Sequence, residues 1–187
     1  NILNHKFDNQ GKKKIRIAYY SADFRNHPMS YLLANLYELH DKNKFEVIGI
    51  SFGPDKDDEM RKRVSSAFDE FYDVRLKTED EIVKLSRELK IDIAIDLMCF
   101  TKYHKFGIFV KRCAPIQVNY LGYPGTSGTN YLDYIIVDKI IIPKESQKYY
   151  SEKIVYLPNT YQANDSTKKI SDKIFTREEL GLPIDGF

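Results

Sequence analysis

Short apolar runs and stretches with helical spacing alternate along most of the chain. The runs are rich in β-branched and aromatic residues, which are typical of buried strands. They lie at residues 15–20, 45–52, 68–74, 91–97, 116–121, 134–137 and 153–157. The run at 68–74 is the most weakly marked. This pattern predicts a sheet whose strands are mostly separated by helices.

Apolar residues between these runs recur at the spacing of an amphipathic helix. Pro28 suits the first turn of such a helix, and Leu32, Leu33 and Leu36 then mark one buried face. The predicted helices lie at residues 28–40, 57–67, 79–89 and 106–113. Residues 159–173 are polar and are expected to be irregular. The alternation of strand and helix predicts an α/β fold with a mostly parallel sheet and helices on both faces.

Composition excludes several classes of protein. Of 187 residues, 42% are hydrophobic and 30% are charged, as in globular proteins rather than disordered ones. The formal net charge of +2 gives no reason to expect nucleic acid or a membrane as a partner. No apolar run reaches the roughly 18–20 residues that span a bilayer. The two cysteines form no Cys-x-x-Cys, which argues against a zinc site and favours a reducing, cytoplasmic location.

Polar side chains follow the first predicted strand, in the loop that leads to the first helix. This loop contains Asp23 and His27, at the carboxyl end of a strand, where ligands bind to open parallel sheets. An imidazole ordinarily titrates at about pH 6.5, so His27 could act as a general base while Asp23 tunes or relays its proton. Alternatively, Asn26 or His27 caps the helix and Asp23 accepts hydrogen bonds from loop amides.

A glycine-rich loop at residues 122–128 (GYPGTSG) follows the fifth run. Glycine permits close backbone approach, and Thr126 and Ser127 supply hydroxyls, so the loop could face a ligand. The alternative is a tight turn that requires glycine for its geometry. The loop lacks the spacing of a Walker loop and of the dinucleotide fingerprint, so neither of those phosphate sites is expected.

A basic loop follows the run at residues 91–97. It contains Thr101, Lys102, His104 and Lys105. Its cations could meet an anionic ligand or a peptide. The alternative is a solvated loop that binds nothing.

Two motifs taken together point to a family. Residues 23–28 (DFRNHP) and residues 114–128, which contain LGYPGTSG, resemble the protein O-linked N-acetylglucosamine transferases and their SPINDLY-like relatives, glycosyltransferase family 41. The resemblance implies that residues 14–187 are the N-terminal Rossmann-like half of a GT-B catalytic region, preceded at 1–13 by a linker or tail. It also implies a missing C-terminal nucleotide-binding domain and N-terminal tetratricopeptide repeats as partners of this half.

The activity implied by the resemblance is transfer of a sugar, N-acetylglucosamine being expected, from a uridine-diphosphate (UDP) sugar to serine or threonine of proteins. No metal or cofactor besides the donor is implied. His27 and Asp23 match the residues beside the reacting centre. The matches to substrate-binding positions are Pro28, Met29, Lys102, Leu121, Gly122, Tyr123, Pro124 and Thr126. This half is expected to be inactive alone, because the diphosphate-binding residues lie in the missing domain.

Two alternatives remain open from the sequence. Met29 stands where the family commonly has threonine, near the N-acetyl group, and its side chain either fills the sugar pocket or packs into the core. The rival to an enzyme is a non-catalytic Rossmann-like module that binds a peptide or a protein partner.

Overall fold

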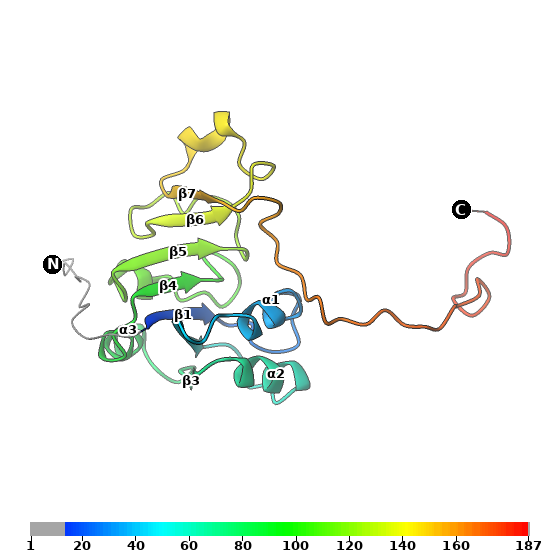
Figure 1. Ribbon diagram of the computed structural model, residues 1–187, viewed down its shortest axis with the longest axis horizontal. Helices are drawn as coiled ribbons and strands as arrows, with labels where there is room; N and C mark the ends of the chain where they lie inside the picture. The colour runs from blue at the N-terminus through cyan, green and yellow to red at the C-terminus, as the bar shows by residue number, and fades with distance from the viewer. Residues whose placement is uncertain (1–13, 187) are drawn as a thin grey trace.

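The computed structural model describes residues 14–186, which form a seven-stranded sheet with helices on both faces (Figure 1). The predicted linker or tail at residues 1–13 lies outside this range. The strands are β1 (Ile15–Ser21), β2 (Phe45–Ser51), β3 (Glu70–Asp73), β4 (Ile93–Asp96), β5 (Ile116–Tyr120), β6 (Tyr134–Val137) and β7 (Lys153–Tyr156). The helices are α1 (Pro28–Glu38), α2 (Glu59–Ala67), α3 (Glu79–Glu88), α4 (Gly107–Val110) and the 3-10 helix η1 (Lys144–Tyr149).

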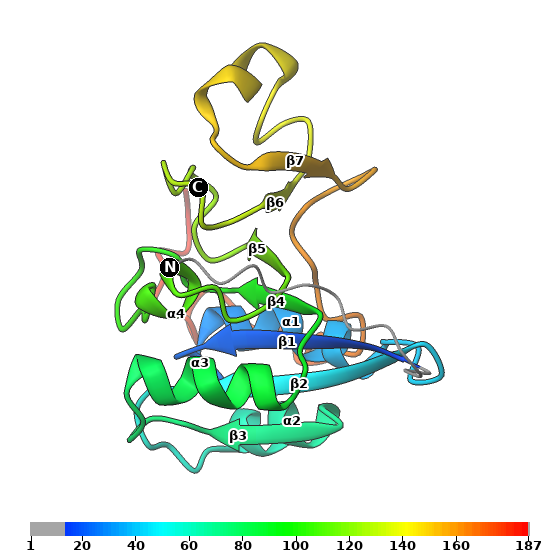
Figure 2. The same cartoon turned by 90° about the vertical axis from the view of Figure 1, so that its left-hand side faces the viewer.

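The strands of this sheet follow the order β3-β2-β1-β4-β5-β6-β7. Each neighbouring pair in that order is parallel. The order reverses direction between β1 and β4, which lie side by side in the middle of the sheet (Figure 2). This is the doubly wound arrangement in which ligands bind at the reversal point. The predicted α/β fold with a mostly parallel sheet is therefore confirmed.

Two apolar cores lie on opposite faces of the sheet. Along β1, Tyr19 points into one core and Tyr20 into the other, as the two-residue period of a strand requires. The first of these cores contains side chains of α1 and α2, such as Leu33 and Val64. The second contains side chains of α3 and α4. Consequently, the chain leaves β1 toward one face and leaves β4 toward the other.

Each of the four predicted helices is shorter than the sequence pattern indicated, and for two of them the structure shows why. The helix predicted at 57–67 begins at Glu59, because Asp58 is its N-cap and its Oδ1 accepts the N–H of Arg61 at 2.9 Å. The helix predicted at 106–113 is reduced to one turn. Arg112 ends it with a φ of 57°, in the left-handed region that a continuing helix cannot adopt.

The irregular segment after β7 crosses back to the face covered by α1 and α2 (Figure 1). The carboxylate of Asp165 accepts a hydrogen bond from Nη1 of Arg63 on α2 at 2.6 Å. Arg63 also pairs with Glu38 of α1 at 2.8 Å, and Ser166 Oγ donates to Asn35 Oδ1 at 2.7 Å. One guanidinium thus joins α1, α2 and the returning segment.

Replacing Arg63 with methionine should make the free energy of unfolding less dependent on pH in the acidic range. The Arg63 guanidinium holds the pKa of Asp165 well below its usual range, and it also lowers the pKa of Glu38. Carboxyls with lowered pKa stabilise the fold above their unfolded values of about 4, and this contribution is lost as the pH falls through the folded values. In urea unfolding, Arg63→Met should be less stable than wild type at pH 7, and the difference should shrink between pH 5 and pH 2. The control is Lys62→Met, which removes an exposed cation from the same helix. A pH-independent difference would contradict the assignment.

Candidate functional site

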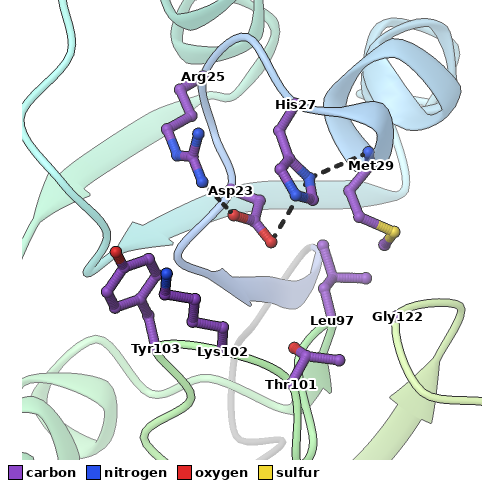
Figure 3. Close-up of a pocket in the computed structure, with 9 residues that line it drawn as sticks. All are labelled: Asp23, Arg25, His27, Met29, Leu97, Thr101, Lys102, Tyr103 and Gly122. Carbon is purple, nitrogen blue, oxygen red and sulfur yellow. Dashed lines mark hydrogen bonds and ion pairs between the residues drawn. The ribbon is translucent and has the colours of Figure 1, made fainter.

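A cavity of about 260 Å³ lies at the carboxyl ends of β1, β4 and β5, beside the point where the strand order reverses. Three loops line it, one from each of these strands (Figure 3). The lining residues are Asp23, Arg25, His27, Met29, Leu97, Thr101, Lys102, Tyr103 and Gly122. The basic loop after β4 and the glycine-rich loop after β5 therefore meet the first loop in one place.

Asp23 is buried and is held from several sides. Its Oδ1 accepts a hydrogen bond from Nη2 of Arg25 at 3.0 Å, and its Oδ2 lies 3.5 Å from Nδ1 of His27 (Figure 3). Its backbone N–H donates to Ser21 Oγ at 2.9 Å, and its carbonyl accepts from Ser30 Oγ at 2.6 Å. The carboxylate therefore has a fixed place between a guanidinium and an imidazole.

His27 is the N-cap of α1 as well as a neighbour of Asp23. Its Nδ1 lies 3.3 Å from the backbone N of Met29, in a position to accept that N–H. The alternative reading of His27 as a helix cap is therefore correct, but it does not exclude a place in the cavity. The companion idea that Asp23 satisfies loop amides is wrong, because the side-chain partners of its carboxylate are Arg25 and His27.

The sequence left open whether the Met29 side chain fills the pocket or packs into the core, and in the structure it contacts both. Its partly buried side chain packs against the core under α1, and it also lines the cavity (Figure 3). It stands above Leu97 and Gly122, on the side of the cavity away from Arg25. A ligand entering between the loops would therefore meet the thioether on that side.

A buried carboxyl shapes the loop after β4. Oδ1 of Asp96 accepts the backbone N–H groups of Met98 and Cys99 at 2.9 and 3.1 Å. Burial raises the pKa of Asp96 to about 6. The turn continues with positive φ at Cys99 and Tyr103, and it brings Lys102 to the cavity wall. The Lys102 ammonium lies 5.0 Å from the centre of the Tyr103 ring.

The loop after β5 approaches the end of β4 so closely that only glycine fits at residue 122. A Cβ added to Gly122 would lie 1.9 Å from the carbonyl oxygen of Leu97. Farther along, Glu152, the residue before β7, accepts a hydrogen bond from Thr126 Oγ1 at 2.7 Å and one from Ser127 N at 2.7 Å. This loop is therefore pinned at one end by backbone contact and at the other by a buried carboxylate.

The matches between this chain and known proteins agree with the two motifs. The sequence profile of Glycosyl transferase family 41 matches residues 2–178. The chain belongs to this family. A solved structure of a Thermobaculum terrenum O-GlcNAc transferase mutant aligns over 84% of this chain and 30% of that chain, with a TM-score of 0.79 and 32% identity. The family resemblance and the expectation of one Rossmann-like half of a GT-B fold are confirmed.

Two curated relatives in family 41 are named as peptide N-acetylglucosaminyltransferases. The probable enzyme SEC of Arabidopsis thaliana is 38% identical over 95% of this chain and 19% of its own length. The Caenorhabditis elegans UDP-N-acetylglucosamine–peptide N-acetylglucosaminyltransferase is 30% identical over 93% of this chain and 16% of its own length. The chain thus spans less than a fifth of the length of these two relatives.

About half of the site residues predicted from the sequence line the cavity. Asp23, His27, Met29, Lys102 and Gly122 line it. The other predicted residues lie outside the lining, with Pro28 exposed on α1 and Thr126 held by Glu152. The remaining three, in the loop after β5, are Leu121, Tyr123 and Pro124.

Four lining residues were not among the predicted site residues: Arg25, Leu97, Thr101 and Tyr103. Arg25 lies inside the motif at 23–28, and the charge of its side chain was a signal that could have found it. Thr101 and Tyr103 lie in the basic loop already considered. Among residues 14–186, no set of three His, Cys, Asp or Glu side chains could hold a metal ion, and no helix is long and apolar enough to cross a membrane.

Replacing Gly122 with alanine should destabilise the fold. The added methyl group would collide with the backbone oxygen of Leu97, so the end of β4 or β5 must move, at a cost of about 1–3 kcal/mol. The matched control is Gly128→Asn in the same loop. Gly128 has a φ of 65° but open space around its Cβ position, and asparagine tolerates that φ. Urea unfolding should separate the two variants, and equal stabilities would show that the close contact carries no cost.

Proposed function

We propose that the full-length protein transfers a sugar from a UDP-sugar to serine or threonine side chains of proteins, and that residues 14–187 form the acceptor-side half of its catalytic region. The observation that carries the proposal is the pairing of Asp23 and His27 in a cavity at the reversal point of a family 41 sheet. The names of the relatives support a peptide acceptor and UDP-N-acetylglucosamine as donor.

In the proposed reaction, the acceptor oxygen forms a bond to the anomeric carbon while the bond from that carbon to the diphosphate breaks. The hydroxyl proton passes to Nε2 of His27, and UDP leaves. For Nε2 to be free, the ring must carry its other proton on Nδ1. In that state Nδ1 gives up the hydrogen bond that it accepts from the Met29 N–H and donates to the Asp23 carboxylate, 3.5 Å away. Asp23 then selects the tautomer of the base, as the carboxylate does in a Ser-His-Asp triad.

The other substrate-binding roles are part of the same proposal. Lys102 would contact the acceptor side, while Gly122 and Met29 would border the sugar. Stabilisation of the leaving diphosphate would come from a C-terminal domain, and tetratricopeptide repeats would present acceptor proteins. We propose that no metal or further cofactor takes part and that the protein acts in the cytoplasm.

The decisive experiment incubates the full-length protein with a panel of UDP-sugars and serine- or threonine-containing peptides. Mass spectrometry of the peptide reports the mass of any sugar added, and release of UDP reports turnover. Sugar added to a hydroxyl supports the proposal. Peptide binding without any mass change from any donor would favour the non-catalytic module instead.

Substitution of the two central side chains should abolish most of the transfer. His27→Gln removes the proton acceptor, and we expect kcat to fall roughly 10²–10⁴-fold, the usual contribution of a general base. Asp23→Asn should also lower kcat, because its amide cannot hold the imidazolium that forms. The control is His104→Gln, which alters an exposed histidine outside the cavity lining. Equal activity of His27→Gln and His104→Gln would remove His27 from the mechanism.

Met29→Thr should raise the preference of the full-length enzyme for the N-acetylated donor. The long thioether side chain lines the cavity, and it should crowd an N-acetyl group more than a hydroxyl. A change of this size in a pocket alters discrimination by about 10–200-fold. The measurement is the ratio of kcat/KM for the N-acetylglucosamine and glucose donors. Leu39→Thr, at the exposed end of the same helix, is the control, and an unchanged ratio in a folded Met29→Thr protein would mean that Met29 does not set the sugar.

A further inference from the structure

We propose that Arg25 is a positioning residue of this site, which orients the Asp23 carboxylate toward His27 and keeps the imidazole ready to accept a proton. This inference rests on the proposed function. Neither the sequence motifs nor the relatives assign a role to Arg25. It lies two residues after Asp23 and two before His27, and its side chain lines the same cavity (Figure 3).

The contacts of Arg25 fix one oxygen of the carboxylate and leave the other for the histidine. Its backbone N–H donates to the carbonyl oxygen of Asp23 at 2.8 Å, which closes a tight turn. Its Nη2 donates to Oδ1 of Asp23 at 3.0 Å, so Oδ2 is the oxygen that faces Nδ1 of His27. Without the guanidinium, the carboxylate could rotate about its side-chain bonds, and Oδ2 would no longer be held facing His27.

The guanidinium has hydrogen-bonding capacity beyond the contact with Asp23. Nε of Arg25 is buried and has no hydrogen-bond partner among the described residues. A buried N–H without a partner is costly, so it is retained only where the position of the side chain matters. The planar fork holds the carboxylate in one orientation, which a lysine ammonium would not do.

Charge is the second effect of Arg25. A guanidinium stays protonated at every working pH, so a fixed positive charge lies within hydrogen-bond distance of the Asp23 carboxylate. The other groups that face this loop come from three elements. Lys102 and Tyr103 belong to the loop after β4. Asp58, the N-cap of α2, accepts the N–H of Asn26, and Arg61 of the same helix donates to the carbonyl oxygen of Phe24 at 3.2 Å. The hydroxyl of Tyr31 on α1 donates to Asn26 Oδ1 at 3.3 Å. The loop after β5 adds Gly122, which carries no charge. Of the two cations that line the cavity, Arg25 is the one hydrogen-bonded to Asp23.

The test compares Arg25→Met and Arg25→Lys in the full-length protein, with kcat and KM measured separately. Loss of the guanidinium frees the Asp23 carboxylate to turn away from His27, so kcat for Arg25→Met should fall about tenfold while KM stays near the wild-type value. Arg25→Lys keeps the charge but lacks the planar fork, so its kcat should lie between those of wild type and Arg25→Met.

A surface substitution, Lys84→Met, removes one cation from α3 and should leave kcat and KM unchanged. A higher KM with an unchanged kcat in Arg25→Met would mean that Arg25 only supports the loop, and it would overturn the inference. A second measurement follows the His27 ring by NMR as the pH is varied, in wild type and in Arg25→Met. A displaced curve in the variant supports the inference, and coincident curves refute it. If no UDP-sugar is transferred by wild type, the proposed function fails, while the NMR comparison still decides the role of Arg25.

Discussion

This site depends on one constraint, namely that the chain leaves two neighbouring parallel strands toward opposite faces of the sheet. β1 and β4 lie side by side in the sheet, but the chain passes from β1 to α1 on one face and from β4 to α4 on the other. Connections that leave in opposite directions cannot fill the space between them, so a crevice forms at their carboxyl ends. The cavity with Asp23 and Lys102 occupies this position, and a parallel sheet with any other point of reversal would separate the two loops.

Within the crevice, one residue of the short loop from β1 to α1 has two roles. His27 ends the loop as the cap of α1, and its ring also faces Asp23. The two roles use the same ring nitrogen in opposite ways. As a cap, Nδ1 accepts a hydrogen bond from the Met29 N–H, whereas in the proposed reaction Nδ1 would carry a proton and donate a hydrogen bond to Asp23. In the proposed reaction, the start of α1 and the proton chemistry would therefore be coupled through this nitrogen.

Most of the architecture could be predicted from the sequence because it follows local periodicity. The run at 116–121 and the pattern after Pro28 each carry a clear period, and the corresponding strand and helix form there. The helix predicted at 106–113 is much shorter in the structure, and the spacing of its apolar residues gives no sign of the cause. The left-handed backbone at Arg112 ends it, and this residue is held by Asp133 and by the carbonyls of Pro115 and Tyr131. Contacts of that range are absent from any short sequence window.

In the site, too, residues placed by their sequence neighbours could be predicted, whereas residues placed by distant contacts could not. Asp23 and His27 could be found because they lie in one loop after a strand. The place of Thr126, by contrast, depends on Glu152, far along the chain and just before β7. Burial opposes ionisation of Glu152, but the hydrogen bonds from Ser127 and Thr126 outweigh it and lower its pKa. The two hydroxyls predicted to face a ligand are consequently turned toward this carboxylate. They hold the glycine-rich loop in place, and Gly122 at its start is the part that reaches the cavity.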